Sequence, residues 1–247
     1  MSRSSHLASF LFLAISFLGL IVIAVLANSP TAIQGDVSWR KTFVGTVFSI
    51  VCILGIIAGI FPSKCSKMFH FKKPQQTTLS PISKEKLPKE KLTLRGHHPD
   101  CGHFAAHVVR VDEKLLCAGC VGLILGAILS LFGVGLVFFA NLPALEDYTF
   151  ILWAGFAGVS CGLLQYHLFN WGRSSVHLAV NAFFVFGVFM LLVGVDGVAK
   201  NIIADFYLIS LSVFWIYTRI LLSQMDHHRI CTTCPSKCEF HSTKKRG

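Results

Sequence analysis

Six long runs of apolar residues constrain this chain more than any other feature of its sequence. Each is close to the length of about 20 residues that a helix needs to cross the hydrocarbon core of a bilayer. Helices are expected because lone strands would leave backbone groups unpaired in lipid, and no stretch shows the alternation of about ten residues that is typical of outer-membrane barrels. We therefore predict an all-α polytopic membrane helix bundle of about six transmembrane helices. The predicted spans are 7–27, 42–61, 118–140, 148–167, 175–195 and 202–222.

The composition argues against soluble domains, since 53% of the residues are hydrophobic and only 14% are charged. The end of the first run, 25–27, resembles a signal-peptidase site. This run is longer than the apolar core of about 7–15 residues found in signal peptides. We expect a retained first helix.

The distribution of Lys and Arg predicts the orientation in the membrane. The segment 62–116 carries 11 of the 22 basic residues, whereas the other side of the bundle holds only Arg40, Lys41 and Lys200. Because cytoplasmic loops carry an excess of Lys and Arg, we expect a multi-pass protein of the cell membrane with cytoplasmic N- and C-termini. The basic loop should attract anionic lipid headgroups. Nucleic acid is not an expected partner, because no reading motif accompanies the Lys residues. Whether the protein has a protein partner stays open.

The predicted organisation has four parts. Segment 63–93 is a basic cytoplasmic linker with an imperfect Lys-Glu-Lys-Leu repeat and little apolar surface to bury. The parts are an N-terminal transmembrane helix pair (1–62), the linker (63–93), a Cys/His loop with a four-helix membrane unit (94–225) and a Cys/His-rich tail (226–247).

Two short pairs of metal-type ligands lie on either side of the start of the third span. His98-x2-Cys101-x15-Cys117-x2-Cys120 has the spacing of a four-ligand zinc site. Cytoplasmic thiols are normally kept reduced, which favours metal ligation over disulfides; a set of unliganded polar side chains at headgroup level is the alternative. The predicted ligands are His98, Cys101, Cys117 and Cys120, with His97, His103 and His107 as alternates.

A second Cys/His cluster closes the chain. Its pattern contains part of an iron–sulfur motif but lacks the usual fourth Cys, so a mixed Cys/His zinc site fits better. Two alternatives stay open: the tail folds back to form one shared centre with the first cluster, or it is a tail without a site. The predicted ligands are His228, Cys231, Cys234 and Cys238, with His241 as an alternate.

Polar residues within the apolar runs are few. Gln165, His167, His177 and Asn181 lie toward the cytoplasmic halves of two spans, where they either line a pocket continuous with the Cys/His site or form interhelical hydrogen bonds. The outer halves contain almost no polar groups, which counts against a transporter.

Three Gly pairs at four-residue spacing predict close packing of helices within the bundle: Gly55/Gly59, Gly122/Gly126 and Gly158/Gly162.

The stretch 117–122, Cys-Ala-Gly-Cys-Val-Gly, with the later Gly126, Gln165 and Arg173-Ser174-Ser175, resembles the membrane-protein family called domain of unknown function 2085. Members have a Cys/His loop followed by Cys-x-x-Cys-x-Gly at the start of a Gly-rich helix. Here Gly119 replaces the Arg that is usual between the two Cys, and the C-terminal cluster is not part of the pattern. The family has no established activity, so the resemblance implies a membrane location and the Cys site.

These observations predict an integral membrane protein with a cytoplasmic transition-metal site, with zinc as the expected metal, whose biological role is open. One alternative is a membrane redox protein that uses an iron–sulfur cluster or thiol exchange. The other is a metal transporter or metal-sensing regulator. An enzyme is less favoured, because the sequence contains no Gly-x-Ser-x-Gly, His-Glu-x-x-His or phosphate-binding loop.

Overall fold

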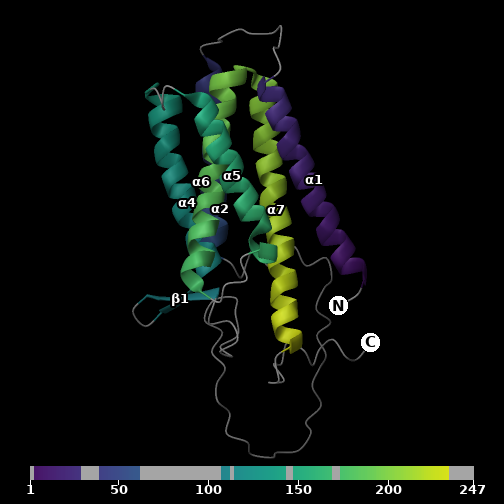
Figure 1. Ribbon diagram of the computed structural model, residues 1–247. Coiled ribbons are helices and arrows are strands. Elements are labelled where there is room, and N and C mark those ends of the chain that lie inside the picture. Colours follow the sequence, from purple (N-terminus) through teal and green to yellow (C-terminus); the bar gives the residue numbers. More distant parts are fainter. Residues whose placement is uncertain are drawn as a thin grey trace, which may run out of the picture.

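The computed structural model of the protein describes residues 3–28, 39–61, 107–111, 114–142, 147–168 and 173–233. The helices in these segments run side by side as one bundle (Figure 1). Six of them are long and apolar enough to cross a membrane, which confirms the predicted all-α polytopic fold. They are α1 (Arg3–Asn28), α2 (Trp39–Ile60), α4 (Ala118–Val134) with its π-helical continuation η2 (Gly135–Phe139), α5 (Tyr148–Leu168), α6 (Ser174–Ala199) and α7 (Ile202–Thr233).

The helix boundaries match the predicted spans within about four residues at every end but one, because apolar length determines them. The exception is α7, which runs on to Thr233, well past the predicted end at residue 222. The helix α1 begins at the end of the bundle where α7 ends (Figure 1).

A two-stranded hairpin lies at that same end of the bundle (Figure 1). Strands β1 (Val108–Val111) and β2 (Lys114–Cys117) pair antiparallel, with Val108 opposite Cys117 and Val111 opposite Lys114. The sequence analysis predicted no strand here. Because α4 begins at Ala118, Cys117 both ends β2 and caps the helix.

The central helix is α6, which packs most extensively against α5 and α4. Glycines permit this close approach: a Cβ on Gly126 would lie 2.5 Å from the carbonyl oxygen of Ala182, and one on Gly158 would lie 3.1 Å from Gly187. The prediction of intramolecular packing is thus confirmed for two of the three Gly pairs. In the third pair, Gly59 approaches Ile124, whereas Gly55 has open space around it.

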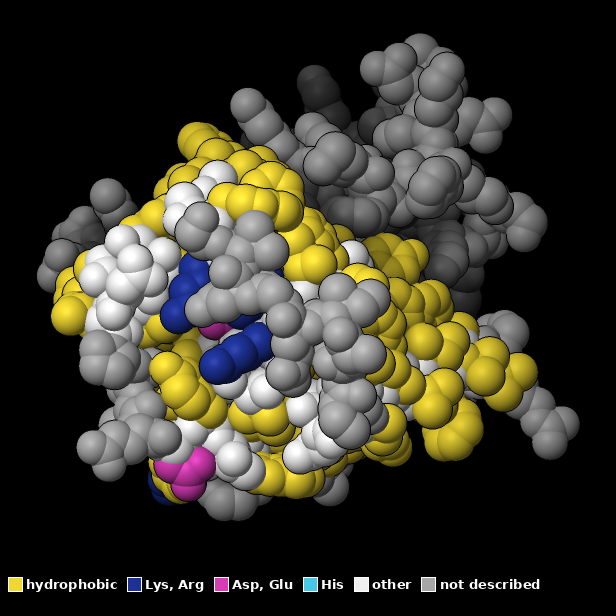
Figure 2. Space-filling view, turned by 90° about the horizontal axis from the view of Figure 1, so that it is seen from above, with side chains coloured by type: hydrophobic (Ala, Val, Ile, Leu, Met, Phe, Trp, Pro, Cys, Tyr) yellow, Lys and Arg dark blue, Asp and Glu magenta, His cyan; other side chains and the backbone are white. Residues whose placement is uncertain are grey.

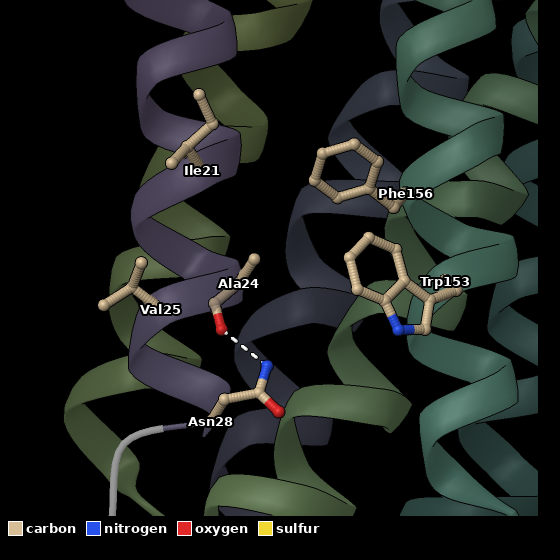
Figure 3. A pocket seen from close by; sticks show the side chains of 6 residues that line it. All are labelled: Ile21, Ala24, Val25, Asn28, Trp153 and Phe156. Carbon is tan, nitrogen blue, oxygen red and sulfur yellow. Dashed lines mark hydrogen bonds between the residues drawn. The ribbon is translucent and has the colours of Figure 1, made fainter.

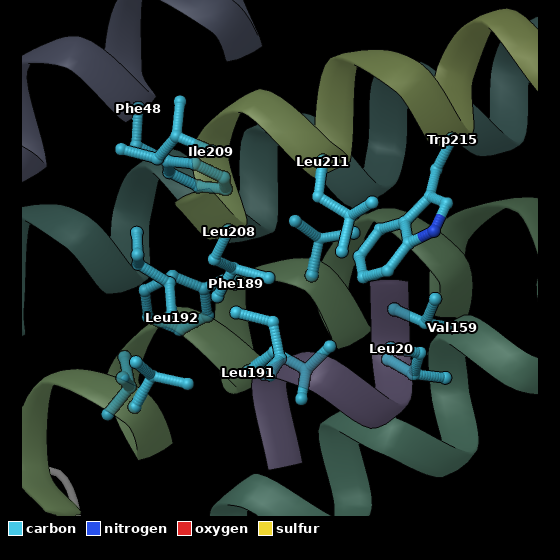
Figure 4. Close-up of a cluster of buried hydrophobic side chains, with 14 of the residues drawn as sticks. Leu20, Phe48, Val159, Phe189, Leu191, Leu192, Leu208, Ile209, Leu211 and Trp215 are labelled. Atoms are coloured by element: carbon cyan, nitrogen blue, oxygen red, sulfur yellow. The ribbon is translucent and has the colours of Figure 1, made fainter. Parts of the chain in front are cut away.

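The other helices close the bundle around α6. Their main partners differ: α1 packs on α7, and α2 packs on α4. Trp215 of α7 is fully buried and its indole N–H donates to the carbonyl of Ser16 on α1, 3.2 Å away. Figure 4 shows the apolar centre between these helices; the fully buried members include Leu20, Val159, Leu191, Leu192, Leu208 and Trp215.

Candidate metal site and its buried polar network

The structure describes only part of each predicted ligand set. From the first set, Cys117, Cys120 and the alternate His107 are described, whereas His97, His98, Cys101 and His103 lie outside the described residues. From the second set, the backbones of His228 and Cys231 belong to α7. Their side chains, together with Cys234, Cys238 and His241, lie outside the described residues.

The hairpin register places His107 beside the start of α4. His107 immediately precedes Val108, and Val108 pairs with Cys117. Cys117 has an extended backbone (φ −68°, ψ 120°) as the N-cap of α4, and the first turn of this helix contains no acidic residue. The partial positive charge of a helix N-terminus favours the thiolate form of a nearby Cys.

Side chains from two helices, α6 and α7, converge on His107. Its ring lies 4.6 Å from the ring of His177 on α6, centroid to centroid, and 5.7 Å from the ring of His227 on α7. Its Nε2 atom lies 3.5 Å from Oδ2 of Asp226. Within the described part of the chain, however, no group of three or more His, Cys, Asp or Glu side chains is placed to hold a metal ion. A complete site therefore requires ligands from the rest of the chain, and the predicted zinc and iron–sulfur centres stay predictions.

A buried hydrogen-bond network lies directly behind these rings. Arg219 of α7 is 5% exposed. Its Nη2 donates to Oε1 of Gln165 and to Oδ1 of Asn181, each at 2.6 Å, and its Nη1 donates to the carbonyl of Gly162. The guanidinium carbon lies 4.6 Å from the ring centroid of Phe184. Every one of these partners is uncharged, and no ion pair of Arg219 occurs among the described residues.

This network determines which nitrogen of His177 carries a proton. Arg219 can only donate, so Gln165 must present its Oε1 to the guanidinium. The Gln165 Nε2 is then the donor in the contact of 2.7 Å with Nδ1 of His177. A neutral His177 with its proton on Nε2 satisfies this bond. His177 thus accepts this hydrogen bond through Nδ1 and carries its proton on Nε2.

Of the two alternatives for the intramembrane polar residues, interhelical hydrogen bonding is present for Gln165 and Asn181, whose side chains are 3.3 Å apart. The ring contact between His177 and His107 also makes the group continuous with the hairpin. The side chain of His167 lies outside the described residues. Sequence reasoning missed the central role of Arg219, although an Arg inside an apolar run is an available signal.

A second charged cluster lies at the opposite end of the bundle, and it corrects the expectation that the outer halves contain almost no polar groups. Arg40 is inside α2 and nearly fully buried. Its Nη2 lies 2.8 Å from Asp196 of α6 and its Nη1 lies 2.6 Å from Asp205 of α7. A tight turn at Lys200 (φ 47°) folds α7 back on α6 and brings the two acids together. In Figure 2, basic side chains surround an acidic one at this end.

A groove of about 520 Å³ lies between α1 and α5 (Figure 3). Asn28, its most polar residue, donates its amide to the carbonyl of Ala24 at 2.8 Å. The groove lies at the end of α1 remote from the hairpin (Figure 1) and holds no ionisable side chain. Its lining consists of Ile21, Ala24, Val25, Asn28, Trp153 and Phe156.

Comparisons with known proteins gave no match to a family model, to a curated protein or to a solved structure. The resemblance to domain of unknown function 2085 therefore stays a prediction. Any functional conclusion depends on the site itself.

Proposed function

We propose that this membrane protein binds a transition-metal ion, zinc in the first place, at the hairpin end of its helix bundle. The observation that carries the proposal is the junction of β2 and α4. There, Cys117 is the N-cap of a membrane helix and Cys120 lies in its first turn. The hairpin register pairs Cys117 with Val108, the residue that follows His107. His98 and Cys101, upstream of the hairpin, are proposed to complete the ligand set.

The chemistry around the junction supports this proposal. Zinc prefers sulfur and nitrogen ligands in tetrahedral sites, and the pair of Cys at i, i+3 spacing shares one face of the helix. A centre with three Cys thiolates and one His around Zn²⁺ carries one net negative charge. The buried guanidinium of Arg219, which has only neutral partners in the described structure, would offset that charge.

The same proposal places the hairpin end of the bundle in the cytoplasm, on the strength of the Lys and Arg bias. A membrane-impermeant thiol reagent should then label Lys200→Cys, at the opposite end, in intact cells. If the reagent labels Arg229→Cys instead, the hairpin end of the bundle lies outside the cell and the proposed orientation is wrong.

The test is the metal content of purified, folded protein. We expect about one zinc per chain, and we expect it to be lost in the variant with Cys117→Ser and Cys120→Ser. The matched control is the variant with Cys52→Ser and Cys161→Ser, because these two Cys lie within α2 and α5, away from the hairpin. A folded wild-type protein without stoichiometric metal would contradict the proposal.

A second candidate is thiol redox chemistry, favoured by the position of Cys117 as the helix N-cap with Cys120 three residues later. Cys-x-x-Cys pairs at helix N-termini often have reactive thiolates. Transport is less favoured. Between Asp205 and Arg219, α7 carries no Asp, Glu, Lys, Arg or His. The buried side chains there include Leu208, Leu211 and Trp215 together with the hydroxyls of Ser212 and Thr218.

A visible absorption spectrum distinguishes these candidates. Protein purified without oxygen should be colourless if it holds zinc, whereas an iron–sulfur cluster would give visible charge-transfer bands. Metal-free protein whose Cys117 and Cys120 cycle between thiol and disulfide would favour the redox candidate.

A further inference from the structure

The groove between α1 and α5 lies within the membrane-spanning part of the bundle. Its lining comes from the last two turns of α1 and from the second and third turns of α5, and both segments belong to candidate membrane spans. Figure 3 shows the rings of Trp153 and Phe156 pointing from α5 toward α1. The groove holds about 520 Å³, which is within the range of about 300–1,000 Å³ that is usual for ligand sites.

The groove has a floor of buried side chains from three helices. Ile23 of α1, Leu152 of α5 and Leu191 of α6 lie next to its walls and are almost fully buried. Its rim is open, since Ile21 is 54% exposed and Trp153 is 53% exposed. An occupant therefore touches the floor and both helices, and it meets the surrounding bilayer on its remaining side.

The lining favours hydrocarbon as the occupant. It consists of five apolar side chains and Asn28, whose amide already donates to the carbonyl of Ala24 within α1. An ordered water needs two to four polar partners, and this lining offers too few. No charged side chain is present to bind a headgroup or another ion. An apolar chain, in contrast, gains dispersion contacts that an empty space would forfeit.

Size and position indicate a lipid chain rather than a protein segment. A stable protein interface uses about 20–30 residues on each side, whereas six residues line this groove. The rim continues into the exposed apolar face of α1, which includes Leu11, Ile15 and Leu18. In a membrane-spanning helix this face contacts the lipid chains of the bilayer, so these chains are already present at the opening of the groove.

We propose that the groove binds one acyl chain of a phospholipid from the surrounding bilayer, held between α1 and the rings of Trp153 and Phe156. The chain fills the space between two helices whose main partners lie elsewhere, because α1 packs chiefly on α7 and α5 packs chiefly on α6. Binding depends on the chain and not on the charge of the headgroup. The inference is independent of the proposed metal-binding function.

Fluorescence quenching by phosphatidylcholine with brominated acyl chains tests this proposal. The full-length protein is reconstituted with the brominated lipid and is then exchanged into detergent, which removes lipid from open surfaces. The difference between wild type and Trp153→Phe isolates the signal of Trp153, and Trp39→Phe isolates that of Trp39 in the same way. Trp39 is the matched control, because it is 54% exposed on α2 and does not line the groove.

After the exchange, Trp153 should stay quenched while Trp39 recovers its fluorescence. Phosphorus analysis should find about one phospholipid per chain, since such sites are few per protein. Brominated phosphatidylglycerol, which is anionic, should give the same result as phosphatidylcholine.

A variant that fills the groove should release the lipid. We expect Ala24→Phe to lower the retained phospholipid by about tenfold or more, the factor that corresponds to about 1.4 kcal/mol, and to restore the fluorescence of Trp153. Leu18→Phe is the matched control, because it adds a ring to a position of α1 that is 60% exposed and outside the groove. Thermal unfolding shows whether each variant is folded, and Ala24→Leu makes the same test with a smaller side chain.

Four results would overturn the proposal. Equal recovery of Trp153 and Trp39 would show that the groove holds only exchanging surface lipid. Retained phospholipid with an unquenched Trp153 would place that lipid elsewhere on the protein. Equal retention in Ala24→Phe and Leu18→Phe would show that the groove does not hold the chain. A dimer in detergent that Ala24→Phe dissociates would assign the groove to a second copy of the protein.

Discussion

Arg219 shows how one residue determines the chemistry of its surroundings. A guanidinium buried without a counter-charge costs several kcal/mol, and this cost is offset here by three oxygen acceptors and the face of Phe184. Because Arg only donates, its bonds also fix the orientation of two amides. Through Gln165 the constraint reaches His177, whose Nδ1 must accept.

Replacement of Arg219 should destabilise the protein strongly. In Arg219→Leu, the oxygens of Gln165, Asn181 and Gly162 lose their donor while still buried, and each such loss costs about 1–3 kcal/mol. We expect unfolding in detergent to show a total loss of about 3 kcal/mol or more, and a smaller loss for Arg219→Lys, which keeps the charge but not the planar fork.

Arg229→Leu is the control for this prediction, because Arg229 is an exposed residue of the same helix. Its effect should be within about 0.5 kcal/mol. Equal losses of stability in Arg219→Leu and Arg229→Leu would show that the buried network does not stabilise the fold.

At the scale of elements, the contact of α4 with α6 positions the Cys pair. A Cβ on Gly122, two residues after Cys120, would collide with the carbonyl oxygen of Leu178 and would lie 2.8 Å from Cβ of Asn181. The first turn of α4 is therefore held against the turn of α6 that carries His177 and Asn181. This contact brings the hairpin junction to the buried network.

Gly122→Ala should cost about 1–3 kcal/mol of stability, because overpacking of a close helix contact forces the backbones apart. Gly55→Ala is the control, since it makes the same change in a membrane helix where nothing lies within 4 Å. There, the higher helix propensity of Ala should leave stability unchanged or raise it by up to about 1 kcal/mol. The same loss at both positions, measured by unfolding in detergent, would contradict the assigned packing.

Elements differed in how far the sequence could predict them. Apolar length was sufficient to predict the helices, and two of the three glycine pairs marked close helix contacts. The sequence did not indicate which helices pack together. The hairpin was missed because Val108–Val111 and Lys114–Cys117 are only four residues each, and pairing between them decides their structure. The end of α7 was missed because its last turns are polar, so hydropathy gave no signal there.

At the scale of the whole molecule, the described residues include one buried Arg near each end of the bundle, and the charges of the two are neutralised differently. Arg40 is neutralised by Asp196 and Asp205, whereas Arg219 has neutral partners in the described residues. The sequence indicated neither arrangement, because tertiary contacts between residues more than 150 positions apart create the first and contacts among α5, α6 and α7 create the second. This asymmetry fits a metal–thiolate centre at the hairpin end alone.

X-ray absorption at the zinc edge of the purified full-length protein tests the metal centre most directly, because it reports the atoms bound to the metal. We predict a mixed shell with sulfur at about 2.3 Å and nitrogen at about 2.0–2.1 Å, from Cys117, Cys120 and the His ligands of the hairpin end. A shell of nitrogen and oxygen without sulfur, or folded protein that contains no zinc, would contradict the account.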